Sequence, residues 1–227
     1  MRHILLEVIV QTLADAREAA AGGADRLEIV RNIRDGGLTP PLSLVEAIAA
    51  ETSLPLRVMV RENASYAIGP GELPALQKAA ADLASLGIDG FVLGFSREHA
   101  LDLDPVCSIL RAAPHVRATF HRAFDDLTDP FSAIDSLAQV PQIDRILTDG
   151  GTGTPAERAE RLRKYVERAA GRLEIMAGGG VDAEALAWFA RERCVREIHV
   201  GRAARDGAHQ DAPVSAAQVR RLRGLAR

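Results

Sequence analysis

The sequence has few cysteines and few lysines, and this scarcity excludes several kinds of site. Its two cysteines, Cys107 and Cys194, do not form a disulfide framework, and such usage favours a reducing compartment. Of the 28 basic residues only Lys78 and Lys164 are lysines, and both fall within expected helices. A Schiff-base lysine at the end of a strand is therefore excluded. The sequence also has no His-Glu-x-x-His zinc signature.

Long apolar runs and a strong charge of one sign are also missing. The longest apolar stretches are only strand-sized, so we expect no segment that crosses a bilayer. The first of them reaches Glu7 too early to form the apolar region of a signal peptide. The formal net charge is −3, which gives no broad attraction to nucleic acid or to anionic lipid. We therefore expect a cytoplasmic protein with no nucleic-acid partner and no membrane partner.

Short β-type runs alternate with longer helical patterns eight times along the chain. The expected strands are Leu5–Val10, Arg26–Val30, Leu56–Arg61, Gly90–Leu93, Arg117–His121, Arg145–Thr148, Glu174–Ala177 and Glu197–Val200. The expected helices are Leu13–Ala21, Leu42–Glu51, Glu72–Leu86, Pro105–Ala112, Pro130–Ala138, Pro155–Ala169, Ala183–Arg191 and Ser215–Leu222. Such alternation implies parallel strands with right-handed crossovers.

Eight such units predict an α/β protein with a TIM (β/α)8 barrel as a single domain over residues 1–227. A doubly wound nucleotide-binding sheet fits less well, because Val10-Gln11-Thr12 stands where its glycine-rich turn would follow the first strand. No linker, low-complexity segment or change in composition divides the chain. With 47% hydrophobic residues, the chain can bury an ordinary globular core.

Polar residues occupy the strand positions that are expected to face the barrel lumen. Alternation along the strands places apolar residues outward and polar residues inward, and the inward set is Glu7, Glu28, Arg61, His121 and His199. Two interpretations of Glu7 and Glu28 remain open, a buried ion-pair layer or groups of a functional site. Arg61 and His121 stand at strand ends, and barrel active sites lie at that face.

The segment Thr119–Asp125 leaves the fifth expected strand with several groups that suit chemistry. A histidine at the rim with a carboxylate nearby suits general acid–base catalysis or metal ligation, so we predict catalytic roles for Glu7, Glu28, His121, Asp125 and His199. Arg122 is positioned to reach an anion. The alternative for His121 is a histidine that only hydrogen-bonds the loop backbone.

Glycine-rich turns follow the last two expected strands. Gly178, Gly179 and Gly180 end the seventh strand, and Gly201 and Arg202 end the eighth. Many barrels bind phosphate with these two loops, because glycines let backbone amides approach an anion closely. We therefore predict anion binding by these residues together with Arg61 and Arg122. The alternative is that the glycines only permit a tight turn.

Several segments together resemble the CutC family. They are Leu6-Glu7, Asp25–Glu28, Gly36–Pro40, Arg61, Thr119–Asp125, Arg145–Thr148 and Ile175–Val181. The resemblance covers roughly residues 5 to 203 and implies a cytosolic barrel protein that is named for copper homeostasis. It also implies a homo-oligomer, a dimer or a tetramer. Copper as a cofactor is implied by the family name alone.

The chain departs from this resemblance at the positions suggested as copper ligands. Relatives commonly carry cysteine just after the glutamates of the first two strands, whereas this chain has Val8-Ile9 and Ile29-Val30. Copper(I) prefers thiolate and thioether ligands. The remaining soft donors near strands are Met59 and Met176.

Three hypotheses about function follow from the sequence. The first is a CutC-like role in copper homeostasis. The second is an enzyme that acts on a small anionic or phosphorylated metabolite, which Arg61 and the glycine loop bind while His121 transfers a proton. The third is a scaffold that binds a partner and performs no chemistry.

Overall fold

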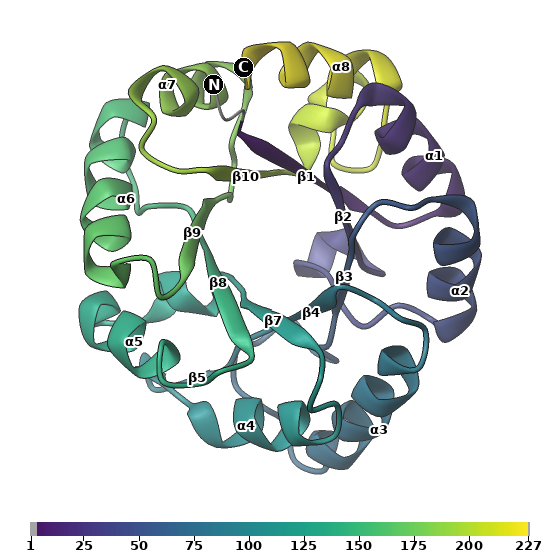
Figure 1. Ribbon diagram of the computed structural model, residues 1–227, viewed down its shortest axis with the longest axis vertical. Helices are drawn as coiled ribbons and strands as arrows, with labels where there is room; N and C mark the ends of the chain where they lie inside the picture. The colour runs from purple at the N-terminus through teal and green to yellow at the C-terminus, as the bar shows by residue number, and fades with distance from the viewer. Residues whose placement is uncertain (1–3, 227) are drawn as a thin grey trace.

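Eight parallel strands close into a barrel surrounded by helices, as the alternation of the sequence predicts. The computed structural model describes residues 4–226. The strands follow one another around the ring in the order β1-β10-β9-β8-β7-β4-β3-β2, with β1 paired to both β2 and β10 (Figure 1). The barrel strands are β1 (Leu5–Val10), β2 (Arg26–Ile29), β3 (Leu56–Met59), β4 (Gly90–Leu93), β7 (Arg117–Phe120), β8 (Ile143–Thr148), β9 (Glu174–Ala177) and β10 (Glu197–Val200).

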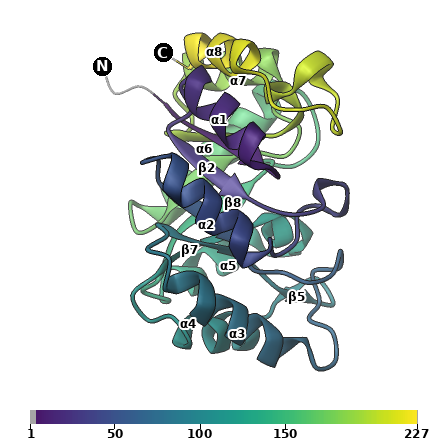
Figure 2. The same ribbon diagram turned by 90° about the vertical axis from the view of Figure 1, so that its right-hand side faces the viewer.

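Helices cover the outside of this ring. They are α1 (Leu13–Gly22), α2 (Leu42–Glu51), α3 (Glu72–Ala84), α4 (Leu103–Arg111), α5 (Pro130–Leu137), α6 (Pro155–Ala169), α7 (Ala183–Glu192) and α8 (Ala216–Leu225). In the side view, α1, α2 and α3 lie in front of the strands (Figure 2). A two-stranded hairpin, β5 (Ser96–Arg97) and β6 (Ala100–Leu101), follows β4. No helix within residues 4–226 is both long enough and apolar enough to cross a membrane.

Most element boundaries agree with the predictions to within one or two residues. Three predicted strands extend beyond the observed strands, which end at Ile29, Met59 and Phe120. In each case one further ladder hydrogen bond continues past the end, as from the Val30 amide to the Val10 carbonyl at 3.0 Å. The chain then turns into a loop, so the inward and outward alternation extends slightly further than the regular strand.

Two helices differ from the prediction for identifiable reasons. The fourth begins at Leu103 rather than at Pro105, with Asp102 at the N-cap. Proline is tolerated in this first turn because amides there have no partner within the helix. The last helix begins one residue later than Ser215 and continues to Leu225, where Leu222 still packs in the core.

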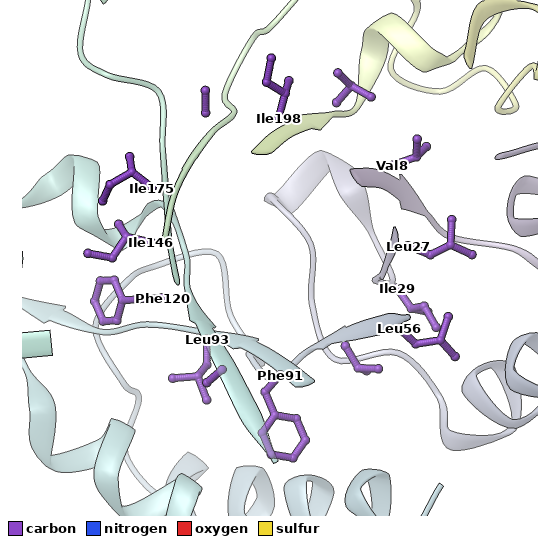
Figure 3. Close-up of a cluster of buried hydrophobic side chains, with 14 of the residues drawn as sticks. Val8, Leu27, Ile29, Leu56, Phe91, Leu93, Phe120, Ile146, Ile175 and Ile198 are labelled. Carbon is purple, nitrogen blue, oxygen red and sulfur yellow. The ribbon is translucent and has the colours of Figure 1, made fainter. Parts of the chain in front are cut away.

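The main hydrophobic core lies between the strands and the helices. Figure 3 shows side chains directed away from the ring, among them Val8, Leu27, Phe91, Phe120 and Ile198. These side chains are fully buried, as the outward half of the strand alternation predicts. A second, smaller apolar cluster consists of Ile9, Val30, Met59 and Val92. Charged residues occupy much of the rest of the lumen, and these define the site.

A glycine in β4 makes room for one of these charged side chains. Gly90 pairs with Arg57 on β3, and a Cβ atom on Gly90 would lie 2.7 Å from the Arg57 Cζ and 2.8 Å from the Arg117 carbonyl oxygen. Any side chain at this position would displace the arginine or the neighbouring strand. We therefore expect Gly90→Ala to lower the free energy of unfolding in urea by about 1–3 kcal/mol.

Gly224→Ala is the matched control for this substitution. Gly224 lies in α8, and a Cβ atom there would meet no atom within 4 Å. The control should leave stability unchanged or raise it by up to about 1 kcal/mol, because alanine favours a helix over glycine. Equal stabilities of the two variants would contradict the crowding described at Gly90.

Candidate functional site

Arg26 is the centre of an ion-pair network inside the barrel. It lies at the start of β2, and its guanidinium contacts Glu7 through Nε and Glu197 through Nη2, the latter at 2.5 Å. Arg145 contacts the same Glu197 carboxylate at 3.1 Å. Arg26 and Glu7 are almost completely buried. Sequence analysis did not single out Arg26, because a charged residue at the start of a strand is usually solvent-exposed.

Arg57 extends this network across the lumen. Its guanidinium is 1% exposed and pairs with Asp89 at 2.6 Å and with Asp144 at 2.8 Å. Asp144 also lies 3.3 Å from Arg145, so the two groups of ion pairs are continuous. Most barrels fill this space with branched apolar side chains. Here the amino-terminal half of the lumen is stabilised by paired charges instead.

Glu7 joins this network to a histidine nearer the carboxyl ends of the strands. On β1, Glu7 pairs in register with Arg26 of β2 on one side and with His199 of β10 on the other. Its Oε1 lies 2.8 Å from the His199 Nδ1. Burial opposes ionisation, but Arg26 and His199 outweigh it and hold the pKa of the Glu7 carboxyl well below its usual range. Both interpretations of Glu7 therefore fit its surroundings, because it belongs to the ion-pair layer and also contacts a histidine of the site.

Glu28 completes a cluster with Glu7 and His199. The Glu28 Oε2 lies 3.2 Å from the His199 Nδ1 and has no hydrogen-bond partner among the described residues. Burial, and then repulsion from Glu7, raise the pKa of Glu28 to about 7, although His199 opposes this. Burial alone would lower the pKa of His199, but Glu28 and Glu7 raise it overall. The cluster therefore holds exchangeable protons near neutral pH.

These three residues have the geometry of a metal-binding cluster. One ligand atom from each residue lies within 4.8 Å of the others, and all three residues are buried. The donors are one imidazole and two carboxylates, which suit divalent ions such as Cu²⁺ and Zn²⁺ better than Cu⁺. The unpartnered Oε2 of Glu28 is consistent with a cation at this position.

A cavity of about 820 Å³ opens above this cluster, at the carboxyl ends of the strands. Its lining includes most of the residues that the sequence singled out. They are Glu28, Arg61, His121, Arg122, Gly179, Gly180, His199, Gly201 and Arg202. Three other predicted residues, Glu7, Asp125 and Gly178, are not part of the lining.

His121 lies at this cavity with one ring nitrogen engaged and the other unpartnered. It precedes the short helix η2 (Arg122–Asp126), and its Nδ1 accepts a hydrogen bond from the Ala123 amide at 3.1 Å. Its Nε2 is buried and has no partner within residues 4–226. Burial, and then the charge of Arg61, lower the pKa of His121 to about 3. The imidazole is therefore neutral at physiological pH.

Arg122 and Asp125 form hydrogen bonds with each other and with neighbouring residues at the mouth of the barrel. The Arg122 Nε donates to Asp125 at 2.8 Å, and its Nη2 donates to Asp149 at 2.7 Å. Asp125 also accepts a hydrogen bond from the Thr148 hydroxyl at 2.5 Å. The anion-binding role predicted for Arg122 is weakened by these two carboxylates, which neutralise its charge. Asp149 was missed because it lies on the next loop along the chain.

The two glycine turns lie side by side at the mouth, but their residues differ in role. Gly179 and Gly180 have positive φ angles of 65° and 72° and line the cavity, as do Gly201 and Arg202. The Gly178 amide instead donates to the Thr148 carbonyl at 2.8 Å. The turn is also held by an arginine that sequence analysis missed, since Arg158 Nη2 donates to the carbonyls of Gly178 and Gly179 at 3.0 and 3.1 Å.

Other residues of the cavity also escaped sequence analysis. Tyr66, in the irregular segment after β3, lies under the Arg61 guanidinium, with 5.0 Å from Cζ to the ring centroid. Gln218, Arg221 and Leu222 reach the cavity from α8, at the far end of the chain. The only feature of the sequence that could have drawn attention to Tyr66 as a cavity residue is the rarity of tyrosine, since the chain has two.

Comparison with known proteins agrees with this architecture. The family model described as the CutC family matches residues 4–204. A family protein CutC from Caulobacter vibrioides is 34% identical over 199 residues, which cover 87% of this chain and 80% of that protein. The human copper homeostasis protein cutC homolog is 32% identical over 179 residues, 78% of this chain and 65% of the human protein.

A solved structure shows the same likeness in three dimensions. The crystal structure of a CutC protein from Streptococcus agalactiae superposes with a TM-score of 0.79 and 27% sequence identity. The match covers 86% of this chain and 97% of that one. The family model and the sequence relatives agree with it, and the chain belongs to the CutC family.

Proposed function

We propose that this protein contributes to copper homeostasis and binds copper as Cu²⁺ at the cluster of Glu7, Glu28 and His199. The human and mouse relatives carry copper homeostasis in their names. The observation that carries the metal part of the proposal is the buried cluster itself, in which the Glu28 Oε2 accepts no hydrogen bond from any described residue. Carboxylate and imidazole donors suit the divalent ion, so we expect Cu²⁺ rather than Cu⁺ at this cluster.

The soft donors within residues 4–226 do not converge in a way that would favour Cu⁺. Cys107 lies on α4 and Cys194 follows α7, and neither lines the cavity. The sulfur of Met176 accepts a hydrogen bond from Arg26 at 3.2 Å. This leaves Met59 as the one sulfur donor of the described residues at the cavity. A single thioether makes a poor Cu⁺ site.

Titration of the purified protein with CuCl₂, followed by calorimetry, tests this proposal. We expect one Cu²⁺ per chain, and we expect Glu28→Gln to weaken binding by at least about tenfold, because the variant loses a charged ligand. Proton release should accompany binding, since ligands must be deprotonated. The double variant Cys107→Ser and Cys194→Ser is the control and should bind Cu²⁺ normally. Tight Cu⁺ binding that is lost in the double variant, or no Cu²⁺ binding at all, would disprove the proposed site.

An enzymatic role on a small anionic or phosphorylated metabolite is the second candidate function. The observation that favours it is Arg61, a buried guanidinium at the cavity that forms no ion pair with any described residue. In this role a bound anion beside Arg61 must first raise the pKa of His121, because the imidazole is otherwise neutral, with its Nδ1 already accepting a hydrogen bond. We also propose a cytoplasmic location. We further propose assembly into a dimer or tetramer, and sedimentation of the purified protein would measure this oligomeric state.

A further inference from the structure

Two buried hydrogen-bond donors at the cavity, the Arg61 Nε and the His121 Nε2, have no acceptor among residues 4–226. Arg61 and His121 are 6% and 3% exposed, and both line the cavity. A buried donor without an acceptor is destabilising and an unpaired buried charge is more so, and therefore native structures rarely keep such groups without a partner. We infer that the cavity binds the acidic group of a small organic anion, a carboxylate or a phosphate, between Arg61 and His121. This inference does not depend on copper binding.

Arg61 is held in place but its charge is not neutralised. Its backbone is fixed by Thr39, whose hydroxyl accepts from the Arg61 amide and donates to the Arg61 carbonyl, both at 2.9 Å. Its Nη2 donates to the Ala64 carbonyl, and its guanidinium stacks over Tyr66. Its Nε is buried and has no acceptor in the described part of the chain. A carboxylate or phosphate supplies the charge-assisted hydrogen bonds that are missing.

The close approach of Gly36 indicates that the fold leaves space for the Arg61 guanidinium at this position. A Cβ atom on Gly36 would lie 3.1 Å from the Arg61 Nη1, and Gly36 itself lines the cavity. With its φ of 82°, Gly36 adopts a backbone conformation that other residues rarely take. The loop that carries Gly36 therefore passes close to Arg61 without covering it.

His121 supplies a neutral donor beside this charge. Because its Nδ1 accepts from the Ala123 amide, the ring proton lies on Nε2, the atom without a partner. A neutral imidazole donates one hydrogen bond to an oxyanion but adds no positive charge to the site. Arginine and a neutral histidine together match an acidic group that has several acceptor oxygens, such as a carboxylate or a phosphate.

The rest of the cavity limits where an anion binds. Arg122 is neutralised by Asp125 and Asp149, and Glu28 repels an anion from the far side of the cavity. Ile9 and Met59 add apolar surface between these ends. The volume of about 820 Å³ is typical of a site for a small molecule. Arg202 and Arg221 also line the cavity, but both are exposed, so the acidic group of the ligand faces the buried Arg61.

Titration of the intact protein with sodium phosphate and with sodium acetate, at an ionic strength kept constant with sodium chloride, tests this inference. The Arg61 Nε–H resonance of the wild-type protein should shift and saturate in nitrogen-15 NMR spectra. Arg61→Gln should weaken anion binding by about tenfold or more, since it removes a charged donor. Arg111→Gln is the control, because Arg111 is exposed at the end of α4 and does not line the cavity. The control should change affinity by less than about threefold.

Each outcome of the titration has a defined meaning. Saturation by phosphate alone identifies a phosphate ligand, saturation by acetate alone identifies a carboxylate ligand, and either result supports the inference. Binding that survives Arg61→Gln but is lost in Arg202→Gln would place the anion at the turn of Gly201 and Arg202 and would overturn it. The absence of saturation by both anions would overturn it as well. The wild-type Nε–H signal decides the question if Arg61→Gln fails to fold.

Discussion

Replacing Arg26 by leucine is expected to lower the free energy of unfolding by about 3–5 kcal/mol, which is a large part of the stability of a domain of this size. Leucine fills part of the space but leaves the carboxylates of Glu7 and Glu197 without their closest cation. Glu7 is completely buried and Glu197 is 9% exposed, so water replaces the lost partner poorly, above all at Glu7. Urea denaturation followed by circular dichroism measures the loss.

Arg17→Leu is the matched control for this substitution. Arg17 also pairs with a glutamate, Glu51 at 2.9 Å, but both side chains are largely exposed. Exposed pairs contribute only about 0–1 kcal/mol, so the control should stay close to the wild type. If both variants lost the same amount of stability, the network inside the barrel would not have the role described.

The second large effect concerns His121 and pH. Its pKa is about 3 in the folded protein and near 6.5 in the unfolded chain, because burial and the charge of Arg61 disfavour protonation. Between these values the unfolded state binds one more proton than the folded state, so the stability contributed by His121 is lost as pH falls. The slope is about 1.4 kcal/mol per pH unit. We expect His121→Gln to be less sensitive to acid than the wild type between pH 6 and pH 4.

Unfolding in urea at several pH values measures this difference. His115→Gln is the control, because His115 is exposed on the outside of the barrel and should not alter the pH dependence. Glu7 also titrates abnormally in acid, but it is present in all three proteins and cancels from the comparison. Parallel stability curves for the wild type and His121→Gln would show that His121 is accessible to water in the folded state.

Much of the fold was predictable because its signals are local. A strand that alternates apolar and polar residues indicates which side faces the helices, and this alternation correctly placed Glu7, Glu28 and His199 inside the barrel. Parallel strands also bring their carboxyl ends to one face, so residues such as Arg61 and His121 were predicted to gather there. Both inferences need only the period of a strand and the direction of the chain.

The partners of these charges were not predictable in the same way. Arg122 was predicted to bind an anion, yet Asp149 on the following loop neutralises it. Arg26 was not recognised, although it holds Glu7 and Glu197 from two different strands. Which charges meet depends on the register between strands and on the path of each loop, and neither follows from the sequence of one segment.

The sequence by itself therefore determined the barrel and the inward direction of its acidic and basic side chains. Strand alternation and β/α repetition are local patterns, so neighbouring residues are enough to reveal them. The tertiary structure alone decided which charges became neutralised. It paired Arg26, Arg57 and Arg122 with carboxylates and left Arg61 facing the cavity without an ion pair to any described residue. The reason is physical: a buried charge is governed by whichever opposite charge lies within a few ångströms, and here those partners come from distant parts of the chain.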